Sequence, residues 1–182
     1  MITNMDTSLY VAKIQAEVLG HRDEVEKAYD RYPDATQFWG FIDLSGSSNY
    51  RIANGPKEGY LLGETFFTLI RTAISSSTEV RLIKEIGDEV FVTSSSFRPM
   101  FESMILIGET ARQLSHVVGS DNFPFALRSA IGFGPAKRLM RSQEDFIGTP
   151  IDQLARIMNI RSQSSNLLIH EEAYRISKDI IT

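Results

Sequence analysis

The 182-residue sequence contains no cysteine, which excludes disulfide bonds, zinc–thiolate sites and catalysis by a thiol. It also lacks an excess of basic residues. Lys and Arg number 19 against 23 Asp and Glu, and the net charge of −4 argues against a general nucleic-acid-binding protein. No apolar run reaches the roughly 18 residues needed to span a bilayer, and the first residues, MITNMDTSLY, do not resemble a secretory signal. We therefore expect a cytoplasmic protein with no nucleic-acid or membrane partner.

The composition that remains is that of an ordinary globular protein, with 42% hydrophobic and 23% charged residues. Residues 8–30 carry apolar side chains at roughly helical spacing among charged ones, which predicts one amphipathic helix that ends before Pro33. After this helix the hydrophobic period changes and no linker or repeat follows. We expect a helical extension over residues 1–35 and a single domain over residues 36–182.

Short apolar and β-branched runs alternate with longer helical patterns in the second part of the chain. Residues 80–86 and 89–95 flank Gly87-Asp88, which is a typical two-residue hairpin turn. Residues 127–134 and 136–140 are expected to form a second hairpin, and the SGSSN segment after residue 44 is expected to be a turn. The remaining predicted elements are strands over 38–44 and 166–170 and helices over 57–76, 99–118, 150–160 and from 171 onward.

The order of these elements is β-α-β-β-α-β with later additions, which is the ferredoxin-like pattern of an α+β fold. Such strands form an antiparallel sheet with its helices on one face. The sequence therefore predicts a ferredoxin-like βαββαβ domain that follows an N-terminal helix.

Two carboxylates stand where predicted strands end. Asp43 closes the apolar strand 38–44, where it is either a turn cap or a ligand, and Asp88 lies in the hairpin turn. If these strands are neighbours, both carboxylates reach the same end of the sheet. Together with main-chain carbonyls they form a site of hard oxygen ligands that suits Mg²⁺.

Four segments resemble the catalytic domain of class III nucleotide cyclases. They are FIDLSGSS (41–48), LIKEIGDEVF (82–91), LRSAIGFGPA (127–136) and DFIGTPIDQLARI (145–157). The resemblance covers about residues 38 to 175. It implies that Asp43, Asp88 and the carbonyl of Leu44 bind two Mg²⁺ or Mn²⁺ ions, which activate the ribose 3′-hydroxyl and neutralise the triphosphate.

The same resemblance implies roles for further residues of the substrate site. Lys84 and Asp145 match the positions that contact the nucleobase, and Arg156 matches the arginine that stabilises charge on the α-phosphate. Gly46, Ser47 and Ser48 occupy the loop whose backbone N–H groups bind phosphates. The residues implied for substrate binding are Lys84, Asp145, Asp152, Ser47, Ser48 and Tyr50.

The sequence departs from the family pattern at three places. Asp152 stands where the family usually has the asparagine that orients the ribose, and an ionised carboxylate does not donate a hydrogen bond. Ser47 stands where many members carry phenylalanine. The basic residue for the terminal phosphates is not obvious in the Gly-rich segment, where Pro135 stands near its place and Lys137, Arg138 or Arg141 are the candidates to substitute for it.

The identity of the base is open at this level. Lys84 and Asp145 suit adenine, cytosine and uracil alike, and Tyr50 or Tyr60 would narrow the base pocket or pack in the core. The short chain and the altered ribose position resemble the stand-alone uridylate and cytidylate cyclases of bacterial anti-phage (Pycsar) systems.

That resemblance implies a UTP or CTP substrate, a 3′,5′-cyclic monophosphate and pyrophosphate as products, and a separately encoded effector that the cyclic nucleotide activates. It also implies a homodimer with two shared sites. The alternatives are an adenylate cyclase, a cyclase-like domain that binds nucleotide without turnover, and an unrelated ferredoxin-like module.

Overall fold

A computed structural model describes the chain as two compact units, Met1–Pro33 and Asp34–Thr182. The residues described are 7–32, 34–117, 126–139, 144–159 and 166–181.

The first unit contains two helices where the hydrophobic period predicted one. They are α1 (Thr7–Gly20) and α2 (Arg22–Arg31). His21 separates them with φ −95° and ψ 0°, outside the helical region. The preceding Gly20 explains the break, because glycine is among the weakest helix formers. The pattern of apolar side chains did not predict the break, because it does not report the backbone conformation of a single residue.

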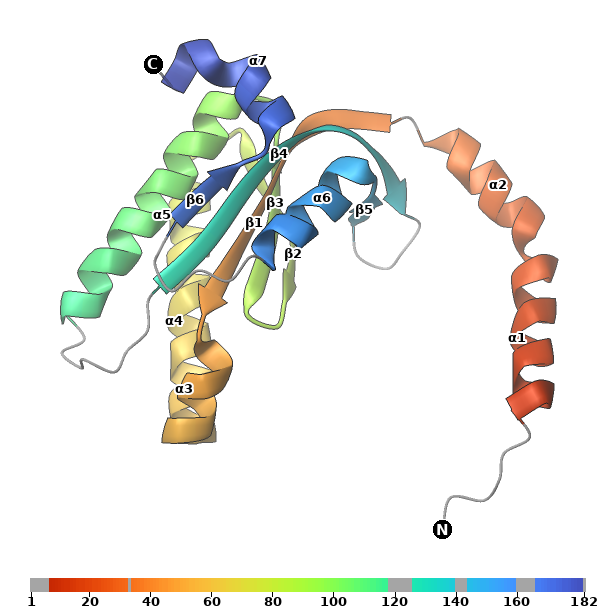
Figure 1. Ribbon diagram of the computed structural model, residues 1–182, viewed down its shortest axis with the longest axis horizontal. Coiled ribbons are helices and arrows are strands. Elements are labelled where there is room, and N and C mark those ends of the chain that lie inside the picture. Colours follow the sequence, from red (N-terminus) through yellow and green to blue (C-terminus); the bar gives the residue numbers. More distant parts are fainter. Residues whose placement is uncertain (1–6, 33, 118–125, 140–143, 160–165, 182) are drawn as a thin grey trace. The chain divides into compact units, whose positions relative to one another are not determined.

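The second unit is built on a six-stranded sheet in the order β2-β3-β1-β4-β5, with β6 paired to β4 (Figure 1). The predicted α+β class is confirmed, and β1 to β4 have the ferredoxin-like arrangement. The strands are β1 (Asp34–Ser45), β2 (Val80–Ile86), β3 (Glu89–Ser94), β4 (Ala126–Leu139), β5 (Asp145–Ile147) and β6 (Asn166–Ile169).

Helices cover both faces of the sheet, whereas the sequence pattern predicted only one covered face. Figure 1 shows α4 and α5 on one side and α6 on the other. None of the helices within the described residues is long and apolar enough to cross a membrane. The helices of this unit are α3 (Ser47–Asn54), α4 (Pro56–Ser75), α5 (Phe97–Val117), α6 (Thr149–Met158) and α7 (Glu171–Ile181).

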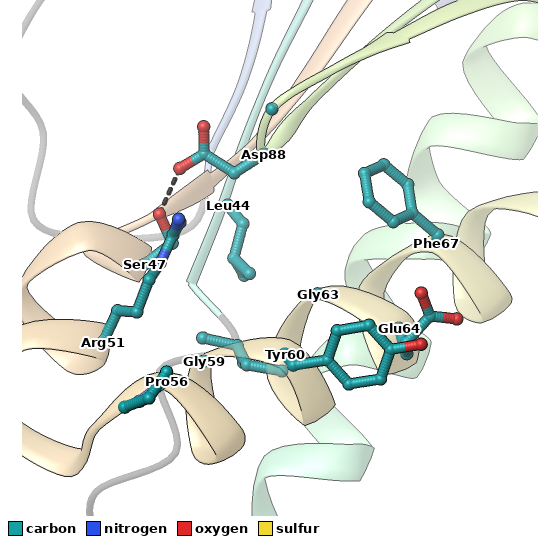
Figure 2. Close-up of a pocket in the computed structure, with 12 residues that line it drawn as sticks. Leu44, Ser47, Arg51, Pro56, Gly59, Tyr60, Gly63, Glu64, Phe67 and Asp88 are labelled. Atoms are coloured by element: carbon teal, nitrogen blue, oxygen red, sulfur yellow. Dashed lines mark hydrogen bonds between the residues drawn. The ribbon is translucent and has the colours of Figure 1, made fainter.

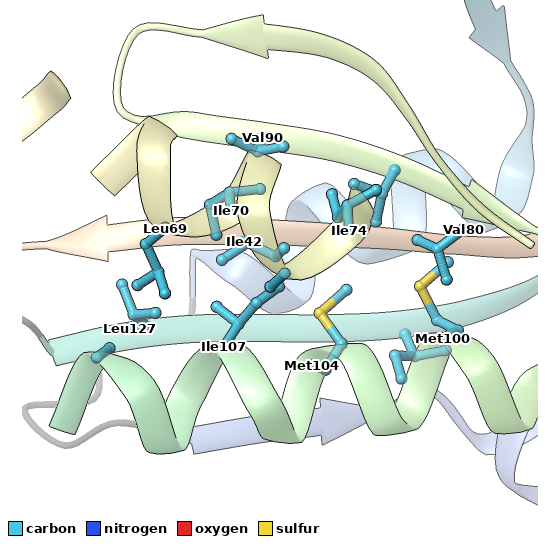
Figure 3. Packing of buried hydrophobic residues seen from close by; sticks show 14 of the residues in the cluster. Ile42, Leu69, Ile70, Ile74, Val80, Val90, Met100, Met104, Ile107 and Leu127 are labelled. Carbon is cyan, nitrogen blue, oxygen red and sulfur yellow. The ribbon is translucent and has the colours of Figure 1, made fainter. Parts of the chain in front are cut away.

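The alternation of side chains along β1 gives each face its own core. Phe38 and Ile42 belong to the larger core beneath α4 and α5 (Figure 3), and Trp39 and Phe41 belong to the smaller core beneath α6. Gly40 lies in the first series, where a Cβ would come within 2.5 Å of the Met104 side chain. A side chain at this position would therefore have to displace Met104 of α5 and the neighbouring Val92 of β3.

The second predicted hairpin is wrong, because β4 continues as one strand through residues 126–139. Its partner β1 begins at Asp34 and pairs with β4 as far as Lys137, which keeps the chain in the ladder beyond Gly134. The indole N–H of Trp39 also donates to the Gly134 carbonyl at 2.9 Å. Met140, the last residue of the predicted hairpin, lies outside the described residues.

Two smaller expectations also need correction. The SGSSN segment is a turn only at Gly46, which has φ +80°, and α3 begins at Ser47. The sheet is not wholly antiparallel, because β6 pairs with β4 in parallel after the chain has passed through α6.

Candidate active site

The sheet register brings Asp43 and Asp88 to the same end of two neighbouring strands. β1 and β3 are antiparallel, and Asp43 lies directly opposite Glu89. The turn that joins β2 and β3 is fixed against β1 by a hydrogen bond from the Leu44 amide to the Asp88 carbonyl at 3.1 Å. Gly87 has φ +63° in this turn, a conformation that favours glycine.

Arg128 pairs with Asp43 across β1 and β4. The two residues are directly opposite in the register, and both Nε and Nη2 of Arg128 donate to Oδ2 of Asp43, the first at 3.0 Å. Burial raises the pKa of Asp43 above its ordinary value, Arg128 lowers this pKa, and the charge of Asp88 raises it further. Sequence reasoning did not assign Arg128 a role, because its contact with Asp43 depends on the register of two strands.

Glu89 is the third carboxylate of the group and was also missed. Burial raises its pKa to about 7, and the charges of Asp43 and Asp88 act in the same direction. Arg128 and Lys84 oppose this shift. The strand alternation provides the signal that could have found it, because a residue opposite Asp43 lies on the same face of the sheet.

The loop after β1 supplies a hydroxyl to this group. Ser47 is buried at the start of α3, and its Oγ donates to Oδ2 of Asp88 (Figure 2). Ser48 is exposed, and the first turn of α3 contains no acidic residue. Tyr50 is half-buried and packs against the larger core.

A cavity of about 300 Å³ lies beside Asp88, between the β2–β3 turn and helices α3 and α4 (Figure 2). Its polar lining comes from Ser47, Arg51, Asp88 and Glu64, and Tyr60 and Phe67 contribute aromatic rings. Tyr60, which the sequence left as either a pocket or a core residue, is 67% exposed and lines this cavity.

Two further predicted residues, Lys84 and Asp145, form an ion pair. Lys84 donates to Oδ1 of Asp145 at 2.7 Å, and the amide of Phe146 donates to the same oxygen at 2.9 Å. Asp145 is buried. Lys84 lies opposite Phe91 in the register, which puts it on the face of the sheet that also carries Asp43.

Asp152 and Arg156 are exposed on α6. Their side chains make no hydrogen bond or ion pair with any residue that the structure describes. Within one chain, Asp43, Asp88 and Ser47 form one group, and Lys84 and Asp145 form an ion pair whose ammonium also acts on Glu89. The two α6 residues contact neither set through a hydrogen bond or ion pair within the described residues.

The first group has the chemistry of a magnesium site that needs its substrate. Asp43, Asp88 and the Leu44 carbonyl offer only hard oxygen ligands. In the described part of the chain, no three His, Cys, Asp or Glu residues are arranged to hold a metal ion by themselves. Mg²⁺ is usually bound through one or two carboxylates together with substrate phosphates, so a two-carboxylate site fits it.

Comparison with known proteins adds structural relatives but no sequence relatives. No protein-family model matches the chain, and no curated protein is significantly similar to it. Among solved structures, it resembles the monomeric guanylyl cyclase domain of the RhoGC fusion protein from the aquatic fungus Blastocladiella emersonii, with a TM-score of 0.70 at 12% identity over 81% of this chain and 88% of that one.

Two further cyclase structures give the same result. The adenylyl cyclase CyaB from P. aeruginosa matches with a TM-score of 0.69 at 17% identity, over 81% of this chain and 84% of that chain. The guanylyl cyclase Cya2 matches with a TM-score of 0.64 at 14% identity, over 79% of each chain. The chain therefore has the fold of the class III nucleotide cyclase catalytic domain.

Proposed function

We propose that this protein is a nucleotide cyclase, which converts a ribonucleoside triphosphate to the 3′,5′-cyclic monophosphate and pyrophosphate. The observation that carries the proposal is the position of Asp43 and Asp88 at one end of β1 and β3, in a fold shared with guanylyl and adenylyl cyclases. Residues 36–182 are assigned to the catalytic domain, whose first strand β1 begins two residues earlier at Asp34, and α1 and α2 form a helical extension before it.

Asp43, Asp88 and the carbonyl of Leu44 would hold two Mg²⁺ or Mn²⁺ ions, which would activate the ribose 3′-hydroxyl and neutralise charge on the triphosphate. Ser47 orients the Asp88 carboxylate through its hydroxyl. Arg128 compensates the charge of Asp43 and supplies a guanidinium beside the expected position of the phosphates. The backbone N–H groups of Ser47 and Ser48 at the start of α3 favour phosphate oxygens.

Recognition of the base is assigned to Lys84 and Asp145, and stabilisation of the α-phosphate to Arg156. Asp152 lies at the ribose position, and Tyr50 supports the loop from the core side. Because the family resemblance implies sites shared between two subunits, we infer a homodimer in which each site takes Asp43 and Asp88 from one subunit and the other residues from its partner. A symmetric interface then forms two equivalent sites.

The favoured substrate is UTP or CTP, made into cyclic UMP or cyclic CMP as a cytoplasmic messenger of anti-phage defence that acts on a separate effector. This part of the proposal rests on the resemblance of the sequence to pyrimidine cyclases, and adenylate cyclase is the alternative.

The test is to incubate the protein with each of the four ribonucleoside triphosphates and Mn²⁺ and to identify cyclic products by mass spectrometry. We expect cyclic UMP or cyclic CMP to dominate, and the Asp88→Asn variant, which keeps the shape of the side chain, to form none. Dominant cyclic AMP would replace the pyrimidine assignment by the alternative. Nucleotide binding without any product, or no binding at all, would refute the cyclase proposal.

A further inference from the structure

The cavity beside Asp88 contains a basic residue that the family resemblance does not assign. Arg51 lies on α3, one helical turn after Ser47, and Figure 2 shows its guanidinium beside Ser47 on the side that faces Asp88. Its side chain is exposed and forms no hydrogen bond or ion pair with the residues that the structure describes. Arg71 and Arg128, by contrast, are paired with Glu85 and Asp43.

Two glycines of α4 shape the wall of this cavity. Gly59 and Gly63 are one helical turn apart, and glycine is among the least favourable residues in a helix interior. A Cβ on Gly59 would collide with Cγ of Arg51, so this glycine lets the stem of Arg51 lie across α4. A Cβ on Gly63 would meet no atom within 4 Å.

No neighbouring atom within the described residues therefore requires glycine at position 63. The missing side chain leaves the cavity open. Gly59 positions a cation at the same cavity, next to a carboxylate proposed to bind metal. A guanidinium matches the geometry of phosphate oxygens and binds them through two parallel hydrogen bonds.

We propose that Arg51 binds the terminal phosphates of the nucleoside triphosphate in this cavity, and that Gly59 and Gly63 keep the space for them. This inference rests on the proposed function, since it identifies the ligand as the part of the substrate that leaves as pyrophosphate. Arg51 complements Arg128, which lies on the other side of the carboxylate group on β4.

The first experiment measures binding of inorganic tripolyphosphate in the presence of Mn²⁺ by isothermal titration calorimetry, which requires neither a base nor turnover. Arg51→Gln is expected to weaken binding by about tenfold or more, the loss typical of a hydrogen bond to a charged group. Arg98→Gln is the matched control, because Arg98 is exposed at the start of α5, beyond the opposite end of β3, and its loss changes the net charge equally.

Gly63→Leu is the second variant. Its side chain enters open space, so the thermal unfolding midpoint should stay the same or rise, while tripolyphosphate binding falls. No binding to the wild type, equal losses in Arg51→Gln and Arg98→Gln, or an unchanged affinity in either Arg51→Gln or Gly63→Leu would overturn the proposal.

Cyclisation assays separate this inference from the proposed function. If the wild type forms a cyclic nucleotide, Arg51→Gln should raise the KM for the triphosphate, and an unchanged KM refutes the role of Arg51 alone. If the wild type forms no cyclic product but the binding losses are as expected, the cyclase proposal fails and the phosphate site stands.

Discussion

Replacing Arg128 by methionine should reveal how strongly the carboxylate group depends on one cation. Methionine keeps most of the aliphatic length of arginine and removes the charge. The side chains of Arg128 and Asp43 are 25% and 12% exposed, so the pair is mostly removed from water. Loss of one partner of a buried pair costs about 3–5 kcal/mol, and an exposed pair contributes about 0–1 kcal/mol.

We therefore expect Arg128→Met to destabilise the metal-free protein by about 2–3 kcal/mol, between these limits. For a domain of this size that corresponds to a decrease in Tm of roughly 4–12 °C. Arg112→Met is the matched control, since it breaks an exposed pair with Glu109 on α5 and should lower Tm by less than about 4 °C.

The effect of Arg128→Met should depend on pH in a defined direction. The folded-state pKa values of Asp43 and Glu89 are raised, so the fold favours their protonated forms and loses stability as the pH rises through these pKa values. For Glu89 this window runs from 4.5 to about 7. Arg128 lowers both pKa values, so its removal should raise them further and make the decrease in Tm larger at pH 8 than at pH 5.

Thermal unfolding followed by circular dichroism, with a chelator present, measures both effects. Added Mn²⁺ should stabilise Arg128→Met more than the wild type, because a bound cation replaces the missing charge. A decrease in Tm equal to that of Arg112→Met, or one that does not change between pH 5 and pH 8, would show that Arg128 does not control the charge of this group.

Three further predictions address the proposed reaction. Asp43→Ala or Asp88→Ala should abolish formation of cyclic nucleotide while the far-ultraviolet circular dichroism spectrum stays unchanged, and near-normal turnover would contradict the metal assignment. Lys84→Met should leave the buried Asp145 without its ammonium partner, so we expect about 2 kcal/mol lower stability in urea unfolding and a KM for the nucleotide raised at least tenfold. Mixing inactive Asp43→Ala with inactive Arg156→Ala should restore activity, since one site of a mixed dimer keeps both wild-type residues. An inactive mixture in which native mass spectrometry detects mixed dimers would refute shared sites.

The sequence predicted the elements whose signal is local. The apolar run ending at Asp43 and the Gly87-Asp88 turn between two β-branched runs each specify their own conformation, so β1, β2 and β3 could be placed before the fold was known. The same kind of reasoning failed where the signal is not local. The β4 strand runs past Gly134 because β1 begins early enough to pair with it, and no residue of β4 alone carries that information.

The carboxylate group likewise contains residues that the sequence predicted and residues that it did not. Asp43 and Asp88 are strand-end residues and can be recognised in the sequence, whereas Glu89 and Arg128 join them only through the registers of β1 with β3 and β4. A shift of one residue in either register would turn these side chains to the other face of the sheet. The ionisation of the group is therefore set by the assembled sheet and not by any single motif.

The position of Arg51, which we propose to bind phosphate, also depends on the assembled fold. In the sequence it is one charged residue in a polar segment, and its neighbourhood depends on how α3 packs across α4 at Gly59. Sheet register and helix packing thus place Arg128 and Arg51 at a group of three carboxylates, in which like charges raise the pKa values of Asp43 and Glu89. Such a group favours divalent cations, and the two guanidinium groups then offer partners to an anion held by those cations. A triphosphate with bound metal offers a cation to the carboxylates and an anion to the guanidinium groups, whereas a free metal ion or a free anion offers only one of these.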